Sequence, residues 1–248
     1  MASITAALTR SHLSKSYTVL APESHVPARV AGWGAAKVTI LISPDMGSKF
    51  CEYLVTLPPT SAAPTPLSTI ERFVYVVSGS LTLGVGHEHH ELDCGSFAYL
   101  PPGTLHQLEA QIESRIVIVD KPYVHAAHVA PLPTVVGHSS DIPPSPIYDD
   151  SQVQLRALLP DSPDMDMAMN IMEFQPGDAL GQVEMHVMEH GLLMLEGNLI
   201  YRLDQDYHPV TAGDTIYMAP YCPQWCACFG NKAARYLLYK NLNRDGFG

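Results

Sequence analysis

Hydrophobic residues in this chain gather in short runs that glycine and proline separate, and no segment shows a long helical period. The runs are rich in Val, Ile, Tyr and Phe, the residues that favour β-strands. After a proline-rich stretch, the same pattern returns from about Leu155 to Lys240. The pattern predicts an all-β protein. In the first half we expect strands at Val38–Ser43, Phe50–Leu57, Phe73–Ser78, Ser80–Val85, Ser96–Leu100 and Ile116–Val119.

The two β-rich parts match each other at a constant spacing of 118 residues, which indicates an internal duplication. We therefore predict an N-terminal arm at 1–37, a first barrel at 38–120, a linker at 121–154 and a second barrel at 155–248. The pairs that share the spacing are Gly79 and Gly197, Gly95 and Gly213, Pro102 and Pro220, Pro58 and Pro176, and His106 and Gln224.

The second copy contains a candidate metal site around Glu184. On an extended chain Glu184 and His186 point to the same side, and His190 has the same parity. One carboxylate and two imidazoles that converge can bind a divalent metal, and Gln224 is in register to add an amide oxygen. The alternative is that these are surface residues of a strand, which three convergent groups between spaced glycines disfavour.

The first copy lacks these ligands, so we expect it to be a metal-free, structural barrel. It keeps only His106, at the place of Gln224. Arg72, Pro66 and Ser68 stand at the places of the other three ligands.

Two further clusters have less specific patterns. The stretch His87–His90 follows Gly86 and precedes a strand, so we interpret it as an exposed hairpin and not as a ligand cluster. The five cysteines are odd in number and scattered, which favours a reducing compartment over a disulfide framework. Among them, Cys222, Cys226 and Cys228 either trap a thiophilic metal or pack beside the barrel, and their spacing favours packing.

Composition and charge narrow the function classes. The 248 residues are 46% hydrophobic and 16% charged, and the formal net charge is −11. This charge argues against binding to nucleic acid or to an anionic membrane through a general basic surface. No apolar run approaches the roughly 20 residues of a membrane-spanning helix. The first 22 residues lack acidic side chains but contain no uninterrupted apolar stretch, so we do not expect a secretory signal.

The glycine-spaced motif with Glu184, His186 and His190, together with the later motif that ends at Gln224, resembles the motifs of cupin barrels. In particular, it resembles the bicupin family of (S)-ureidoglycine aminohydrolases. The usual cupin order of ligands is His, His, Glu and His, whereas this chain has Glu, His, His and Gln, as that family does. The resemblance covers the chain from about Ser43 to Asp245. It is carried by Gly177-x6-Glu184-x-His186-x3-His190-x6-Gly197, by Gly213-x6-Pro220-x3-Gln224, by Phe50–Leu57 and Asp164–Ile171, and by the terminal Tyr239–Asp245.

The resemblance implies a fold of two tandem antiparallel β-barrels of the jelly-roll, or double-stranded β-helix, type. It implies Mn²⁺ bound by Glu184, His186, His190 and Gln224, with Fe²⁺ or another divalent metal as alternatives. It also implies substrate contacts from residues that match Tyr201, Tyr236 and Lys240. The implied reaction converts (S)-2-ureidoglycine to (S)-ureidoglycolate and ammonia in purine and allantoin breakdown.

The residues themselves support part of this assignment. Tyr236 and Lys240 share one face of the last strand, so both enter the cavity if that face is inward. Lys240 then acts as a proton shuttle or as an anchor for a carboxylate, or else it is a solvated strand end. Each of Tyr201 and Tyr236 either orients the substrate or is an ordinary packing residue.

Two other functions stay open at this point. One is another small-molecule cupin reaction, such as an Fe-dependent dioxygenase or an isomerase, and the other is a non-catalytic module that binds a small ligand. We expect a homo-oligomer, because partner subunits commonly cover open barrel edges, and no nucleic-acid or membrane partner. We expect a cytoplasmic protein of bacterial type, or one in the endoplasmic reticulum or an organelle if it is of plant type.

Overall fold

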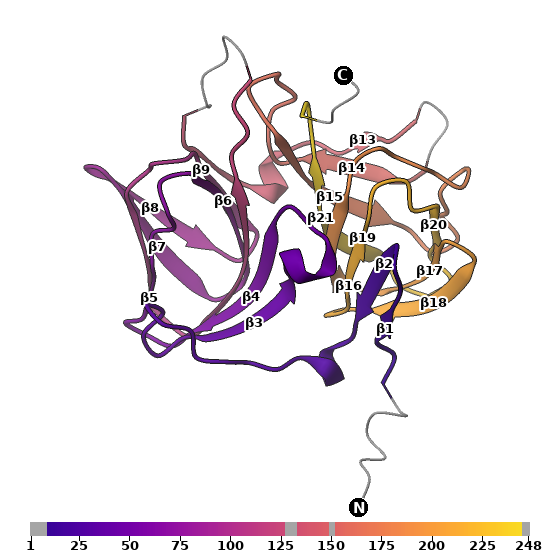
Figure 1. The fold of residues 1–248 in the computed structure, drawn as a ribbon, viewed down its shortest axis with the longest axis horizontal. Coiled ribbons are helices and arrows are strands. Elements are labelled where there is room, and N and C mark those ends of the chain that lie inside the picture. The colour runs from indigo at the N-terminus through magenta and orange to yellow at the C-terminus, as the bar shows by residue number, and fades with distance from the viewer. Residues whose placement is uncertain (1–8, 127–132, 149–151, 245–248) are drawn as a thin grey trace, which may run out of the picture. The chain divides into compact units, whose positions relative to one another are not determined.

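The computed structural model of the chain describes residues 9–126, 133–148 and 152–244 (Figure 1). Strands dominate, as predicted. Among the described residues, the helical elements are the short 3₁₀ turns η2 (Pro22–Ser24), η3 (Pro44–Met46) and η4 (Ser139–Asp141). Within the described residues, no helix is long and apolar enough to cross a membrane.

The chain divides into two compact units, each made of two antiparallel sheets. The N-terminal unit is drawn from Val26–Pro143 and Leu158–Asp166. Its six-stranded sheet has the order β12-β9-β6-β11-β4-β3, and its four-stranded sheet the order β5-β10-β7-β8. The strands are β3 (Lys37–Ile42), β4 (Cys51–Leu57), β5 (Ala62–Ala63), β6 (Ile70–Ser78), β7 (Ser80–Val85), β8 (Glu88–Asp93), β9 (Ser96–Leu100), β10 (His106–Ala110), β11 (Ser114–Pro122) and β12 (Val135–His138).

The C-terminal unit comprises the rest of the described chain. Its eight-stranded sheet has the order β1-β2-β19-β16-β21-β15-β14-β13, and its three-stranded sheet the order β18-β17-β20. The strands are β1 (His12–Leu13), β2 (Tyr17–Leu20), β13 (Ser145–Pro146), β14 (Gln154–Ala157), β15 (Met167–Phe174), β16 (His190–Glu196), β17 (Asn198–Leu203), β18 (Asp206–Thr211), β19 (Thr215–Met218), β20 (Gln224–Ala227) and β21 (Ala234–Asn241).

Each unit has a hydrophobic core of its own, to which alternate residues of its strands contribute. Val55, Val74 and Leu83 are fully buried in the core of the N-terminal unit. Leu192 and Leu203 are fully buried in that of the C-terminal unit. The alternation of buried residues along these strands is the pattern that the sequence showed.

The 118-residue repeat is visible in the turns between strands. Gly79 ends β6 with a φ of 89°, and Gly197 ends β16 with a φ of 70°. A Cβ atom on either glycine would lie under 3 Å from backbone atoms of a neighbouring strand, so both positions need glycine. The same turn was therefore retained in both copies for a steric reason.

The segments expected as an arm and a linker contribute strands to both units. Residues 17–20 form β2, which pairs with β19 of the C-terminal unit, so indigo β2 lies beside β19 in Figure 1. Residues 135–138 form β12, which pairs with β9 of the N-terminal unit. The hairpin β13–β14 belongs to the C-terminal unit instead. By their contacts, the described residues up to His25 and the segment Pro144–Ala157 group with the C-terminal unit, and Val26–Pro143 groups with the N-terminal unit.

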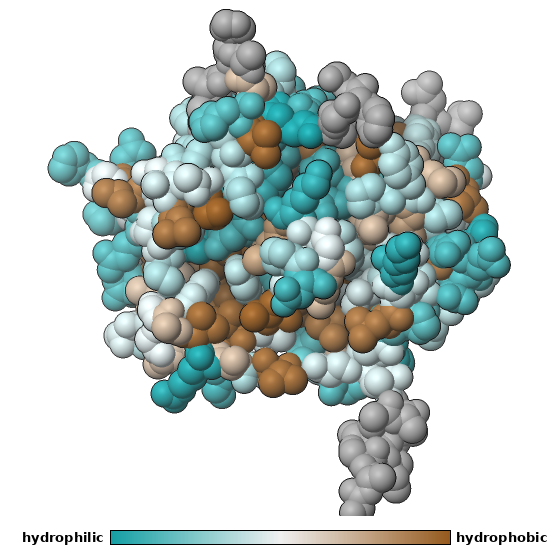
Figure 2. Space-filling model, viewed as in Figure 1, coloured by the Kyte–Doolittle hydropathy of each residue, from teal (hydrophilic) through white to brown (hydrophobic). Residues whose placement is uncertain are grey.

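The surface mixes polar and apolar side chains. On the face shown in Figure 2, small brown groups lie among teal and white residues. The most exposed large apolar side chains include Leu105, Leu67, Val26, Leu13 and Phe229.

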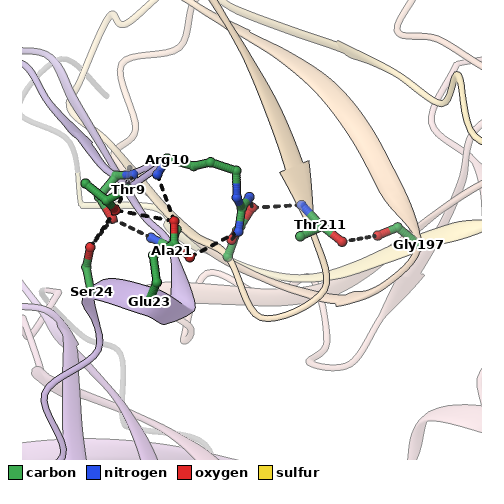
Figure 3. Close-up of polar contacts among 9 residues, drawn as sticks. Thr9, Arg10, Ala21, Glu23, Ser24, Gly197 and Thr211 are labelled. Atoms are coloured by element: carbon green, nitrogen blue, oxygen red, sulfur yellow. Dashed lines mark hydrogen bonds and ion pairs between the residues drawn. The ribbon is translucent and has the colours of Figure 1, made fainter. Parts of the chain in front are cut away.

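Within the C-terminal unit, Arg10 joins the N-terminal hairpin β1–β2 to Asp214, the residue before β19 (Figure 3). Its guanidinium makes a bidentate contact with Asp214, in which Nη2 lies 2.9 Å from Oδ1. Asp214 is fully buried and also accepts a hydrogen bond from the backbone nitrogen of Thr211 at 2.8 Å. On the solvent side, the Arg10 backbone nitrogen donates to Glu23 at 2.7 Å.

Replacing Arg10 with Met should lower the unfolding free energy of the C-terminal unit by about 1–2 kcal/mol, because buried Asp214 loses its charged donor. Denaturant unfolding followed by the fluorescence of Trp225, in a Trp33→Phe background, measures this. Glu23→Gln is the matched control, and it should change stability by less than about 0.5 kcal/mol because the exposed amide still accepts. Equal stability of the two variants would contradict the role of Arg10.

Candidate functional site

The C-terminal unit contains a cavity of about 310 Å³ between its two sheets. It is lined by residues from the large sheet, from β20 and from the segment that precedes β16. Every residue that the sequence nominated lines it: Glu184, His186, His190, Tyr201, Gln224, Tyr236 and Lys240.

Glu184 and Gln224 are joined by a pair of backbone hydrogen bonds. The Glu184 nitrogen donates to the Gln224 oxygen at 2.8 Å, and the Gln224 nitrogen donates back at 2.9 Å. This isolated antiparallel bridge is followed by a hydrogen bond from the Tyr221 nitrogen to the His186 oxygen at 2.6 Å, and the segment forms no regular strand. Because directly opposed residues of an antiparallel pair project to the same side, the carboxylate and the amide reach the same cavity.

Two side chains hold the carboxylate of Glu184. One oxygen lies 3.0 Å from Nε2 of His186, and the other accepts a short hydrogen bond from the hydroxyl of Tyr148. Burial raises the pKa of Glu184, but the hydrogen bonds from His186 and Tyr148 outweigh burial and leave it below its ordinary value. Glu184 is therefore an anion at neutral pH.

His190 begins β16 and lies directly opposite Lys240 on β21. Its side chain is buried, and its ring centroid lies 5.3 Å from that of His186. Burial, followed by the charges of His186 and Lys240, lowers the pKa of His190 to about 3. The imidazole of His190 is therefore neutral and has a lone pair available for a metal.

Lys240 lines this cavity, and in the described part of the chain no carboxylate lies within ion-pair distance of it. Tyr236 and Lys240 both enter the cavity, as their alternation on the last strand predicted. Tyr201 and Tyr236 are buried with ring centroids 6.4 Å apart. Burial raises the pKa of both phenols well above the ordinary value, so they act as neutral hydrogen-bond donors. The Tyr201 hydroxyl lies 3.4 Å from Oε1 of Gln224.

Sequence reasoning missed three polar residues of this cavity, Ser145, Tyr148 and Asn170. Tyr148 lies in the segment expected as a linker, and the pairing of β13 with β14 places it against Glu184. Asn170 lies on β15, where alternation places it on the same inward face as Met172 and Phe174. The period-2 pattern of β15 was a usable signal for Asn170, whereas the sequence held none for Tyr148.

The residues fit a divalent cation by donor type. As the side chains stand, no three His, Cys, Asp or Glu groups of the described chain surround a common point closely enough to hold an ion. Glu184 is instead hydrogen-bonded to His186 and Tyr148. One carboxylate, two imidazoles and an amide oxygen nevertheless share one cavity, and this mixed N/O set suits Mn²⁺ or Fe²⁺.

The corresponding place in the N-terminal unit is filled by the guanidinium of Arg72. Its Nε and Nη2 atoms bond to the two carboxylate oxygens of Asp120, each at 2.7 Å. Its Nη1 donates to the Pro64 carbonyl at 2.5 Å. Arg72 is 2% exposed, so an internal cation stands where the second copy has His190.

His106 and Trp33 complete the surroundings of Arg72. His106 Nδ1 lies 2.9 Å from the Thr104 carbonyl, which can only accept, so Nδ1 carries the proton. The other nitrogen, Nε2, then accepts from Arg72 Nη1 at 3.4 Å. The guanidinium carbon lies 5.8 Å from the centroid of the Trp33 ring, within range of a cation–π contact.

The histidine stretch and the cysteine cluster lie where the sequence predicted, one in a surface hairpin and the other in the core. His87 lies in the turn after β7, and His89 and His90 lie on β8, so they form a hairpin at the surface. Cys222, Cys226 and Cys228 are buried members of the C-terminal core, and all three are free thiols.

Comparison with known proteins agrees with this architecture. A family model described as "Cupin domain" matches the chain twice, over residues 53–120 and 170–239. The chain is 39% identical to the (S)-ureidoglycine aminohydrolase of Arabidopsis thaliana over 239 residues, which is 96% of this chain and 79% of that protein. It is 34% identical to the Escherichia coli (S)-ureidoglycine aminohydrolase over 93% of this chain and 90% of that protein. The crystal structure of protein Ylba from E. coli matches with a TM-score of 0.86 and 31% identity, covering 96% of each chain.

Replacing Arg72 with Met should lower the unfolding free energy of the N-terminal unit by about 2–3 kcal/mol, because Asp120 would be left without its charged partner. Trp33 fluorescence in a Trp225→Phe background follows that unit during denaturation. Arg115→Met removes an exposed arginine from the neighbouring strand and should cost less than about 0.5 kcal/mol. If the two variants unfold alike, Arg72 is not the internal cation described above.

Proposed function

Because the chain belongs to the (S)-ureidoglycine aminohydrolase family of cupin-domain proteins, we propose that its C-terminal cavity hydrolyses (S)-2-ureidoglycine to (S)-ureidoglycolate and ammonia. The observation that supports this reaction most directly is the pairing of His190 with Lys240 across β16 and β21. It puts a neutral imidazole and a cation side by side in a small cavity, which suits a substrate that carries a carboxylate beside an amino group.

Glu184, His186, His190 and Gln224 would hold a divalent ion, with Mn²⁺ favoured by the oxygen donors. When bound, such an ion supplies Lewis-acid chemistry and a template that fixes one face of the substrate carbon. Tyr201 holds the Gln224 oxygen in the cavity by its hydrogen bond, and Tyr148 does the same for Glu184. Both phenols thus orient ligand atoms.

Lys240 anchors the substrate carboxylate. A lysine without an acidic partner in a half-enclosed cavity leaves its charge available for an incoming anion. This anchor sets the orientation of the carbon that bears the amino and ureido groups. Tyr236, on the same face of β21, adds a neutral hydrogen-bond donor to the substrate pocket.

The overall reaction replaces the amino group of the substrate with a hydroxyl group from water. Water forms the new C–O bond, the C–N bond to the amino group breaks, and the amino nitrogen takes the proton that water gives up. The ureido group and the carboxylate are unchanged, so the site must hold both while it replaces the third polar substituent. The reaction belongs to the breakdown of purines through allantoin.

Lys240→Met tests the proposal. Wild-type protein reconstituted with Mn²⁺ should release ammonia from freshly prepared ureidoglycine faster than spontaneous decay and give (S)-ureidoglycolate. Lys240→Met should lose at least about 100-fold in kcat/KM while it keeps its metal, because the carboxylate loses its charge partner. Lys232→Met, at an exposed lysine of the same unit, is the control and should have normal activity. Full activity of Lys240→Met would remove Lys240 from the mechanism, and no ammonia from the wild type would refute the function.

Tyr148→Phe should weaken Mn²⁺ binding about tenfold, because Glu184 loses the donor that orients its carboxylate. The EPR signal of free Mn²⁺ during a titration measures this affinity without any turnover. Tyr207→Phe, at an exposed tyrosine of β18, is the matched control and should leave the affinity unchanged. An affinity of Tyr148→Phe equal to that of the wild type would show that Tyr148 does not position Glu184.

A further inference from the structure

Asn170 is a buried polar residue that the reaction scheme above does not use. It lies in the middle of β15, is 5% exposed and lines the C-terminal cavity. Within the described residues, no hydrogen bond of its side-chain amide is found. The amide is not among the fully buried polar atoms that lack a partner, so it opens into the cavity, where a ligand can complete its hydrogen bonds.

The sheet places Asn170 on the same cavity wall as His190, two strands away. Asn170 pairs with Leu238 on β21, and Leu238 pairs with Leu192 on β16. His190 and Lys240 form the next pair along the same inward face. Two strand spacings, about 10 Å, therefore separate the backbone of β15 from that of β16, and the cavity lies in front of both.

The neighbours of Asn170 on β14 and β15 are apolar. Met172 follows it on the inward face of β15, and Leu155 pairs with Met172 from β14. On β21, Leu238 lies directly opposite, and Lys240 and Tyr236 lie diagonal to Asn170. Asn170 is thus the polar group that β14 and β15 contribute to the cavity lining, and a hydrogen bond to it is strengthened by the apolar residues beside it.

We infer that Asn170 is a specificity-determining residue that recognises the terminal amide of the ureido group. This inference rests on the proposed function. With the carboxylate at Lys240 and the reacting carbon on the side of His190, the third substituent extends toward β15.

An asparagine amide offers one carbonyl acceptor and an NH₂ donor. A ureido terminus offers the complementary NH₂ and carbonyl, so the two groups form paired hydrogen bonds. A carboxylate has only acceptors and an ammonium only donors, so neither satisfies both sides of Asn170.

The test compares two stable ligands that differ only at this terminus. N-carbamoylglycine carries the ureido NH₂, and N-acetylglycine has a methyl group in its place. Calorimetric titration of Mn²⁺-loaded wild-type protein should show a preference of about tenfold or more for N-carbamoylglycine. Asn170→Leu should reduce this preference to within about twofold while its affinity for N-acetylglycine and its Mn²⁺ content remain normal. Asn198→Leu makes the same chemical change at an exposed position and should keep the preference.

Each outcome is decisive for Asn170. Retention of the preference in Asn170→Leu, or its absence from the wild type, overturns the inference. Asn170→Ala repeats the measurement if the leucine variant does not fold, as judged by its thermal unfolding. Ammonia release by the wild type distinguishes a failure of the Asn170 inference from a failure of the proposed hydrolysis. An active wild type whose ureidoglycine KM is unchanged in Asn170→Leu refutes the role of Asn170 alone. A wild type that prefers N-carbamoylglycine but releases no ammonia refutes the reaction alone.

Discussion

The site depends on one backbone constraint, the two hydrogen bonds that join Glu184 to Gln224. The segment before β16 has no strand of its own, and Gln224 begins β20. The bridge brings the carboxylate and the amide to one cavity, and it sets the direction in which the chain continues through His186 to His190. His190 is in turn fixed opposite Lys240 by the pairing of β16 with β21. The carboxylate, the imidazoles, the amide and the lysine therefore meet because of one isolated bridge and one pair of strands in register.

The two copies of the barrel balance their interior charge in different ways. The N-terminal unit neutralises Asp120 with the guanidinium of Arg72, whose Nε, Nη1 and Nη2 atoms each donate to a protein acceptor and whose plane lies near the ring of Trp33. Such a cation is permanent and needs no exchange with solvent. In the C-terminal unit the corresponding position is the neutral His190, and the carboxylate of Glu184 lies at the cavity wall. One copy is thus closed by its own side chains, and the other keeps its polar groups available to ligands.

Much of the fold could be predicted from local patterns, because alternation and turn residues report which face of a strand is buried. The strands expected at 80–85 and 96–100 have those bounds in the structure, and the glycine turns recur in both copies. The pattern could not show which strand pairs with which. β2 therefore appeared as part of an arm, although Tyr17 is 1% exposed and pairs with Met218.

The site has the same limit, because the sequence pattern does not show which strands pair. Glu184, His186, His190 and Gln224 were recognisable because their spacing is local within each motif. Tyr148 was not, because its contact with Glu184 depends on how the hairpin β13–β14 pairs with β15, which the local pattern does not show. The alternation of β15 indicated that Asn170 faces inward, but a single polar side chain among apolar residues has no motif around it to mark a functional role.

The most direct test of the account is a Mn²⁺ titration of metal-stripped protein, followed by pulsed EPR of the bound ion. The account predicts one tightly bound Mn²⁺ per chain, with nitrogen couplings from two imidazoles that fall to one when His190 is replaced by Ala. Two equivalent ions per chain, or a bound ion without imidazole couplings, would contradict a single centre built by Glu184, His186, His190 and Gln224.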